Sequence, residues 1–81
     1  MTYHEVISKR ILNLCAERDI TINKLADLAG MRQSTLDNII RGNTKSPGIR
    51  TLNRIAHGFA ITAAQLLDFP EMNDTDFEED K

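Results

Sequence analysis

The chain has 81 residues and a formal net charge of −2, with 41% hydrophobic and 27% charged residues. These proportions and this length fit a single globular domain with a thin core. The one cysteine excludes an internal disulfide, and no apolar run reaches the ~18 residues of a transmembrane span. The sequence therefore predicts a cytoplasmic protein without membrane contact. The two histidines and the cysteine are scattered along the chain, so neither a metal site nor a cofactor is expected.

Charge is distributed unevenly. Residues 71–81 contain six of the twelve acidic residues, whereas residues 1–70 contain nine Lys and Arg against six Asp and Glu, a net charge of +3. We predict a mildly basic folded domain over residues 1–70 and an acidic, disordered tail over residues 71–81. Such a tail is either a solvating end or a working part, and its composition favours the first.

Helical periodicity dominates the N-terminal part, and no alternating strand pattern of useful length occurs. Apolar residues spaced three or four apart predict one amphipathic helix over Thr2–Arg18. Thr21 is a good N-cap for a second helix over Ile22–Ala29, which Gly30 ends by allowing a left-handed conformation.

A third helix is expected over about residues 33–41, with Leu36 and Ile39 facing inward and Gly42 ending it. The sequence GNTKSPG that begins at this glycine is typical of a loop, because Gly, Asn, Ser and Pro interrupt regular structure.

Two more helices are expected in the C-terminal part. Apolar residues at helical spacing predict a fourth helix over Ile49–Phe59. Thr62 followed by Gln65 is a capping-box pattern that opens a short fifth helix. Pro70 is expected to end the ordered chain. Five short helices make an all-α domain.

One spacing in the second and third helices points to function. Ala26 is small enough for the third helix to cross close over the second, and Gly30 makes the sharp turn between them. Leu36 and Ile39 anchor the third helix and force its opposite face outward. This is helix-turn-helix geometry, in which the second helix of the pair lies in the DNA major groove. The outward face carries Gln33, Ser34, Asp37, Asn38 and Arg41.

Three segments follow one another in a fixed order: ITINKLADLAGMRQSTLDNIIRG at 20–42, TLNRIAHGF at 51–59 and ITAAQLL at 61–67, with a loop ending at Pro47 before the second. In this order and spacing the chain resembles the phage repressor and Cro-like helix-turn-helix family, also called the XRE family. The resemblance covers about residues 11–69. It implies a compact, five-helix, lambda-repressor-like domain that binds double-stranded DNA.

The resemblance also implies roles for individual residues. Gln33, Ser34 and Asn38 match positions that usually contact base edges, where Gln and Asn amides can pair with adenine. A larger set matches positions that usually hold DNA phosphates: Thr21, Asn23, Arg32, Thr35, Arg41, Asn43, Thr44 and Lys45. Arg50 and Arg54 are equally consistent with phosphate binding and with a solvated face.

The chain departs from the family pattern at several positions. Arg32 occupies the usual N-cap position of the third helix, which predicts a weak cap. Ile22 replaces a glutamine that helps to clamp a phosphate. Cys15 and Ile40 replace an Arg–Glu ion pair found in some members, and we interpret them as an apolar substitute. Ala60 stands where the family often has glycine.

The sequence thus predicts a sequence-specific transcriptional regulator, a repressor of the phage or bacterial kind that binds a short palindrome as a homodimer. Dimer contacts are expected after the fourth helix, because a short terminal helix cannot bury all the apolar residues there. These are Ile61, Leu66, Leu67 and Phe69.

The alternative is a protein-interaction module on the same fold, such as an antitoxin-like or regulator-binding protein. The acidic tail and the only mildly basic body support it. No enzyme is expected, because no nucleophile arrangement occurs and so small a helical domain leaves little room for a substrate cleft.

Overall fold

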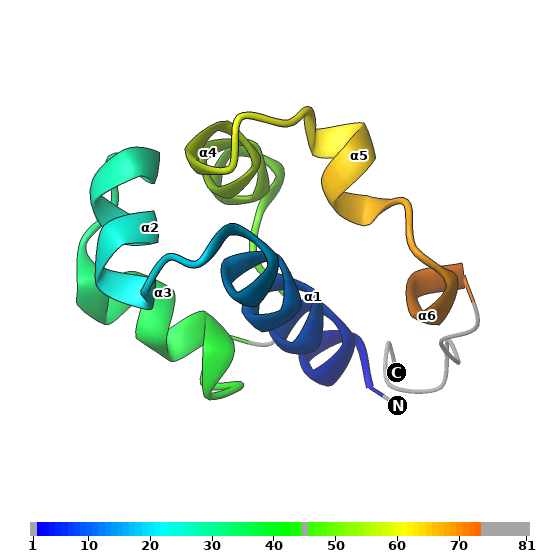
Figure 1. The fold of residues 1–81 in the computed structure, drawn as a ribbon. Helices are drawn as coiled ribbons and strands as arrows, with labels where there is room; N and C mark the ends of the chain where they lie inside the picture. Colours follow the sequence, from blue (N-terminus) through cyan, green and yellow to red (C-terminus); the bar gives the residue numbers. More distant parts are fainter. Residues whose placement is uncertain (1, 45, 74–81) are drawn as a thin grey trace.

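The computed structural model describes residues 2–44 and 46–73, which form six helices and no strand (Figure 1). In chain order they are α1 (Tyr3–Arg18), α2 (Ile22–Ala29), α3 (Gln33–Ile40), α4 (Ile49–Gly58), α5 (Ala63–Leu67) and α6 (Pro70–Asn73). The expected all-α class is confirmed. In the described part of the chain, no helix is long and apolar enough to cross a membrane.

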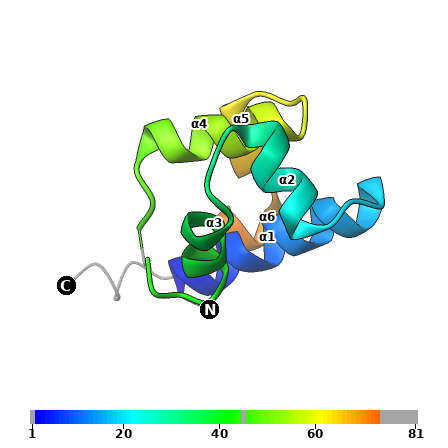
Figure 2. The same cartoon turned by 90° about the vertical axis from the view of Figure 1, so that its left-hand side faces the viewer.

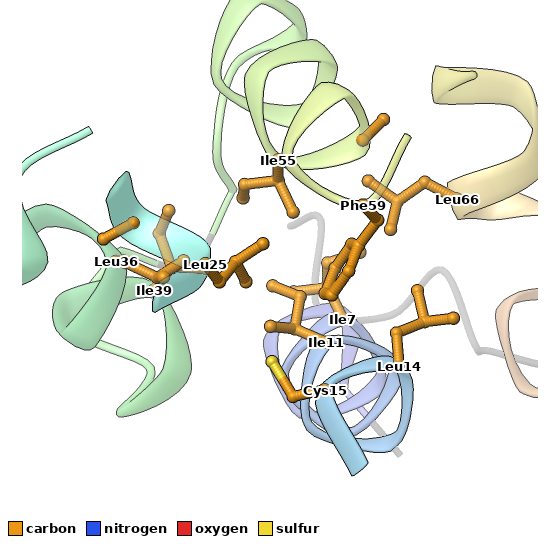
Figure 3. Close-up of a cluster of buried hydrophobic side chains, with 12 residues drawn as sticks. Ile7, Ile11, Leu14, Cys15, Leu25, Leu36, Ile39, Ile55, Phe59 and Leu66 are labelled. Carbon is orange, nitrogen blue, oxygen red and sulfur yellow. The ribbon is translucent and has the colours of Figure 1, made fainter. Parts of the chain in front are cut away.

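Helix α1 lies at the centre of the fold. Helices α2 and α3 lie on one side of it, α4 and α5 lie above it, and α6 lies on the opposite side in Figure 1. Helix α3 packs against α1 and α2, while α4 packs against α2 and α5. The side chains at their meeting point form one core (Figure 3). Among its largest fully buried members are Ile11, Leu25, Leu36, Ile39, Ile55 and Leu66.

Side chains cap the starts of α1 and α5. At α5, the Thr62 hydroxyl accepts the Gln65 N–H at 3.0 Å, and Gln65 Oε1 accepts the Thr62 N–H at 2.9 Å, which confirms the expected capping box. At α1, Glu5 Oε1 accepts from the Thr2 hydroxyl at 2.7 Å and from the Thr2 N–H at 3.3 Å. These two hydrogen bonds lower the pKa of the Glu5 carboxyl.

The first four helices end in the same way. A residue with positive φ follows each of them: Asp19 (54°), Gly30 (67°), Gly42 (82°) and Ala60 (60°). The N–H of that residue bonds to the carbonyl three residues back, and the next N–H bonds to the carbonyl five back. This is the Schellman motif. After α1, α2 and α4 the next residue is apolar and packs against the core: Ile20, Met31 and Ile61.

The end of α4 leads to a stability prediction. Ala60 holds a left-handed conformation (φ 60°) that costs a Cβ-bearing residue more than glycine. Ala60→Gly should therefore stabilise the fold by about 0.5–1 kcal/mol in urea unfolding, after allowing for the greater freedom of glycine in the unfolded chain. Ala64→Gly, on the exposed side of α5, is the matched control and should destabilise. Equal effects of the two changes would contradict this account.

Pro70 does not end the ordered chain; it begins α6. Proline fits the first turn of a helix because its missing N–H has no intrahelical partner there. Met72 of α6 packs against the core. The expected domain boundary at residue 70 thus falls at the start of a packed helix, and residues 74–81 of the expected acidic tail lie outside the described residues.

The premise for two expected dimer contacts was wrong. Leu66 is 0% exposed and Phe69 is 8% exposed, so the monomer itself buries them. Leu66 packs in the core, and Arg10 of α1 ties the end of α5 to α1. Its Nε and Nη2 donate to the carbonyls of Leu66 (3.0 Å) and Gln65 (2.8 Å), and its guanidinium lies 5.0 Å from the Phe69 ring centroid. Ile61 and Leu67 remain half-buried.

Candidate nucleic-acid interface

Helices α2 and α3 form a pair joined by a sharp turn. The Thr21 hydroxyl accepts the Lys24 N–H at 3.1 Å and so caps the start of α2, as expected. Gly30 closes its end, and α3 begins three residues later. Ala26 is buried on the inner side of α2. Figure 2 shows the two helices together on the side that faces the viewer. The expected helix-turn-helix is therefore present.

The two faces of α3 differ sharply. Leu36 and Ile39 are both 0% exposed and anchor the helix in the core. Gln33, Ser34 and Asn38, the three expected base-contacting residues, are all exposed on the remaining surface of the helix. Their side chains are uncharged and carry both donors and acceptors, a property that suits the reading of base edges. Asp37, also expected to face outward, is half-buried.

A buried serine of α1 holds the C-terminal end of α3. Ser8 Oγ lies 2.9 Å from the Ile40 carbonyl oxygen and 3.2 Å from that of Ile39, within donating distance of both. At the same end, a Cβ atom on Gly42 would lie only 2.7 Å from His4 Cδ2. Sequence reasoning missed this connection, although Ser8 interrupts an otherwise apolar face of α1.

Cys15 and Ile40, interpreted as an apolar substitute for an ion pair, belong to the two helices that Ser8 joins, α1 and α3. Cys15 is buried, and burial raises the pKa of its thiol. Ile40 is half-buried against the same core. An apolar pair therefore occupies these positions, while the hydroxyl of Ser8 supplies the polar tie.

Removal of that hydroxyl should be costly. Ser8→Ala removes the side-chain donor of the part-buried Ile40 carbonyl, whereas the Ile39 carbonyl still accepts the Gly42 N–H. We therefore expect a loss of about 1–3 kcal/mol in the free energy of unfolding. Ser46→Ala, at an exposed loop position, is the control and should change stability by less than about 0.5 kcal/mol. Similar values for both variants in urea unfolding would refute the role of Ser8.

The end of α3 differs from the other helix ends in one respect. Asn43 follows the left-handed residue, where α1, α2 and α4 have a core-packed apolar side chain. Its Nδ2 lies 3.3 Å from Oδ1 of Asn38, and both side chains are exposed. The Asn38 carbonyl also accepts the N–H groups of Asn43 (2.9 Å) and Thr44 (3.2 Å). At the end of α3, an amide–amide contact between Asn43 and Asn38 thus stands where the other three helix ends have an apolar contact. It lies on the exposed surface of α3 that also carries Gln33 and Ser34.

The expected phosphate contacts fall into three groups, all exposed. They stand at the start of α2 (Thr21, Asn23), at the start of α3 (Arg32, Thr35) and at its end with the following loop (Arg41, Asn43, Thr44). Lys45 lies outside the described residues. Arg32 has extended backbone angles and makes no capping hydrogen bond with its side chain, which confirms the expected weak cap of α3.

The fold and this surface define a helix-turn-helix domain with one outward-facing polar helix. Residues 10–71 match the model of the Cro/C1-type HTH DNA-binding domain, and the chain therefore belongs to this family. The family is defined by DNA binding rather than by an enzymatic activity.

The chain is similar to proteins of prophage and bacterial origin. It is 34% identical over 59 residues to YopS of Bacillus subtilis (strain 168), an SPbeta prophage-derived uncharacterized HTH-type transcriptional regulator; the alignment spans 73% of this chain and 80% of YopS. The crystal structure of the prophage Lp1 protein 11 matches with a TM-score of 0.79 at 33% identity, over 90% of this chain and 96% of that one. A chain of the SinR–SinI protein complex matches with a TM-score of 0.70 at 27% identity. The match covers 91% of this chain and 71% of that one.

Proposed function

We propose that this protein is a cytoplasmic, sequence-specific transcriptional repressor that binds a short palindromic operator as a homodimer. Helix α3 enters the major groove, where Gln33, Ser34 and Asn38 contact base edges. The observation that carries the proposal is the contrast between the two faces of α3, one buried at Leu36 and Ile39 and the other exposed and rich in amides. Similarity to YopS, a transcriptional regulator by name, supports it.

The phosphate contacts surround this helix in the proposed complex. The N-terminus of α2, with Thr21 and Asn23, faces one phosphate through backbone N–H groups. Arg41 and the loop after it face another. These contacts set the position of α3 without reading sequence, whereas the amides on α3 discriminate between bases.

The dimer contact is proposed for Ile61 and Leu67, which remain partly exposed beside α5. A two-fold dimer would place its two α3 helices about one DNA turn apart, ~34 Å. We expect sedimentation to show a dimer on DNA, and Ile61→Ala to weaken dimerisation. Ile61 also packs against the core, so thermal unfolding should show that the Ile61→Ala monomer is still folded. Sedimentation of a monomer alone, both free and on operator DNA, would contradict this part of the proposal.

A protein-interaction module is the second candidate. The structural similarity to a chain of the SinR–SinI complex favours it, because that chain is part of a complex of two proteins. Leu12 of α1 and Leu28 of α2 are each 46% exposed and offer apolar contact surface. The two functions differ in salt dependence on DNA: a gel-shift titration with random duplex should show affinity falling steeply with salt for a DNA-binding protein.

A further inference from the structure

A small apolar pocket lies where five segments of the chain meet: α1, the loop before α4, α4 itself, α5 and α6. Its volume is about 120 Å³. Five of the residues that line it are only half-buried: Tyr3, Pro47, Leu52, Leu67 and Met72. Leu52, Leu67 and Met72 also pack against the core, so the core holds this wall of the pocket in place. The described residues thus leave preformed apolar surface uncovered.

The pocket has the size of one aromatic ring. A cavity of about 150 Å³ lined by apolar side chains binds benzene. This pocket is slightly smaller and opens to solvent on one side, so a phenyl ring attached to a chain can enter it. Among the described residues that line it, none is charged.

The sequence that follows α6 contains one such ring. Residues 74–81, which lie outside the described residues, have a single hydrophobic side chain, Phe77, among five acidic residues. A segment that only solvates the chain end has no need of a phenylalanine. Met72 lines the pocket, and Phe77 follows it by five residues, which span at most about 17 Å. So short a connection keeps Phe77 near the pocket at high effective concentration.

The charges beside Phe77 suit the rim of the pocket. Asp76 and Glu78 flank the phenylalanine in sequence, and no carboxylate lines the described pocket to repel them. Pro47 directly precedes Gly48, the N-cap of α4, which makes no side-chain hydrogen bond to the first turn. The first N–H groups of α4 therefore have a partial positive charge that favours nearby carboxylates.

We propose that Phe77 occupies this pocket of its own chain and holds the acidic residues around it beside the loop between α3 and α4. Ser46 and Pro47 of this loop line the pocket, and Asn43 and Thr44 of the same loop are proposed phosphate contacts. Carboxylates held there repel DNA phosphates within about one Debye length, ~8 Å at physiological salt. The C-terminal segment thus antagonises DNA binding. This last step rests on the proposed function, whereas the docking of Phe77 does not.

Methyl NMR spectra of the full chain without DNA test the docking. An aromatic ring in the pocket shifts the methyl signals of Leu52, Leu67 and Met72, and Phe77→Ala should remove that shift. The methyl signals of Leu12 and Leu28, which are exposed outside the pocket, should stay in place and verify that the fold is unchanged. Thr75→Ala, two residues before Phe77, is the matched control and should move none of these signals.

Two results would overturn the docking. Pocket methyl signals that do not move in Phe77→Ala would leave the pocket without Phe77. A shift that grows with protein concentration would assign the pocket to Phe77 of a second copy, because docking within one chain does not depend on concentration.

Gel shifts with random duplex test the antagonism. Phe77→Ala keeps every charge of the chain, so a change in affinity reports where the carboxylates are held and not how many there are. We expect Phe77→Ala to bind several-fold more tightly than wild type at about 50 mM salt, and the difference to shrink at about 200 mM. Thr75→Ala should bind like wild type. Equal affinities of wild type and Phe77→Ala at the lower salt would overturn the antagonism. Absence of binding by every variant would contradict the proposed function, while the methyl spectra would still decide the docking.

Discussion

Asn38→Ala should cost about 1–3 kcal/mol of binding free energy on the preferred operator and almost nothing on random DNA. The amide of Asn38 is exposed on α3 and interacts favourably only with a base that offers matching donors or acceptors. Gln33→Ala should behave alike, because Gln33 stands at the first position of α3. Each change should relax specificity at one base pair per half-site.

Competition binding with operator and random duplex measures this ratio directly. Asn13→Ala, an exposed asparagine of α1 outside the proposed interface, is the matched control and should leave the ratio unchanged. Asn43→Ala is informative as well: loss of its 3.3 Å contact to Oδ1 should free the Asn38 amide and reduce specificity by less than loss of Asn38 itself. A ratio unaffected by both Asn38→Ala and Gln33→Ala would mean that α3 does not read the sequence.

Arg41→Ala should have a different signature. Arg41 is exposed at the C-cap of α3, and a phosphate contact there does not depend on sequence. We therefore expect weaker binding to operator and random DNA by the same factor, and a salt slope reduced by about one per subunit.

The control for Arg41 is Arg41→Lys, which keeps the charge and should restore most of the salt slope. A loss of affinity confined to the operator would place Arg41 among the base-reading residues instead. An unchanged slope in Arg41→Ala would leave Arg41 on a solvated face and move the phosphate contacts to the loop and to α4.

Local signals in the sequence were sufficient for most of the fold. The bounds of α2 agree with the expected Ile22–Ala29 because Thr21 caps its start and Gly30 ends it. The inward positions of Leu36 and Ile39 follow from helical spacing alone. The outward face of α3 follows in turn, except that Asp37 is half-buried. The base-contacting roles of Gln33, Ser34 and Asn38 were implied by the resemblance to the Cro-like family.

Contacts between distant segments had no comparable signal. Ser8 reaches carbonyls 31 and 32 residues away, and Arg10 reaches carbonyls 55 and 56 residues away. Hydrophobic periodicity describes one helix at a time and cannot pair a polar side chain with the end of another helix. For the same reason the burial of Leu66 was missed: its side chain packs in the core formed with α1 and α4, and a short helix considered by itself appears to leave it exposed.

Helix ends without glycine were the other gap. Asp19 and Ala60 adopt the left-handed conformation that the sequence analysis expected only at Gly30. The apolar residues that follow, Ile20 and Ile61, pack against the core and hold these turns in place. Tertiary packing here outweighs the local cost of the conformation.

The central claim is that α3 reads DNA sequence, and selection from a random duplex library with wild-type protein and with Asn38→Ala tests it most directly. The account predicts that the wild type enriches an inverted repeat with half-sites about 10–10.5 base pairs apart. It predicts that Asn38→Ala selects the same repeat with one base pair per half-site no longer specified. No enrichment by the wild type, or an identical preferred sequence for both proteins, would contradict the claim and favour the protein-interaction module.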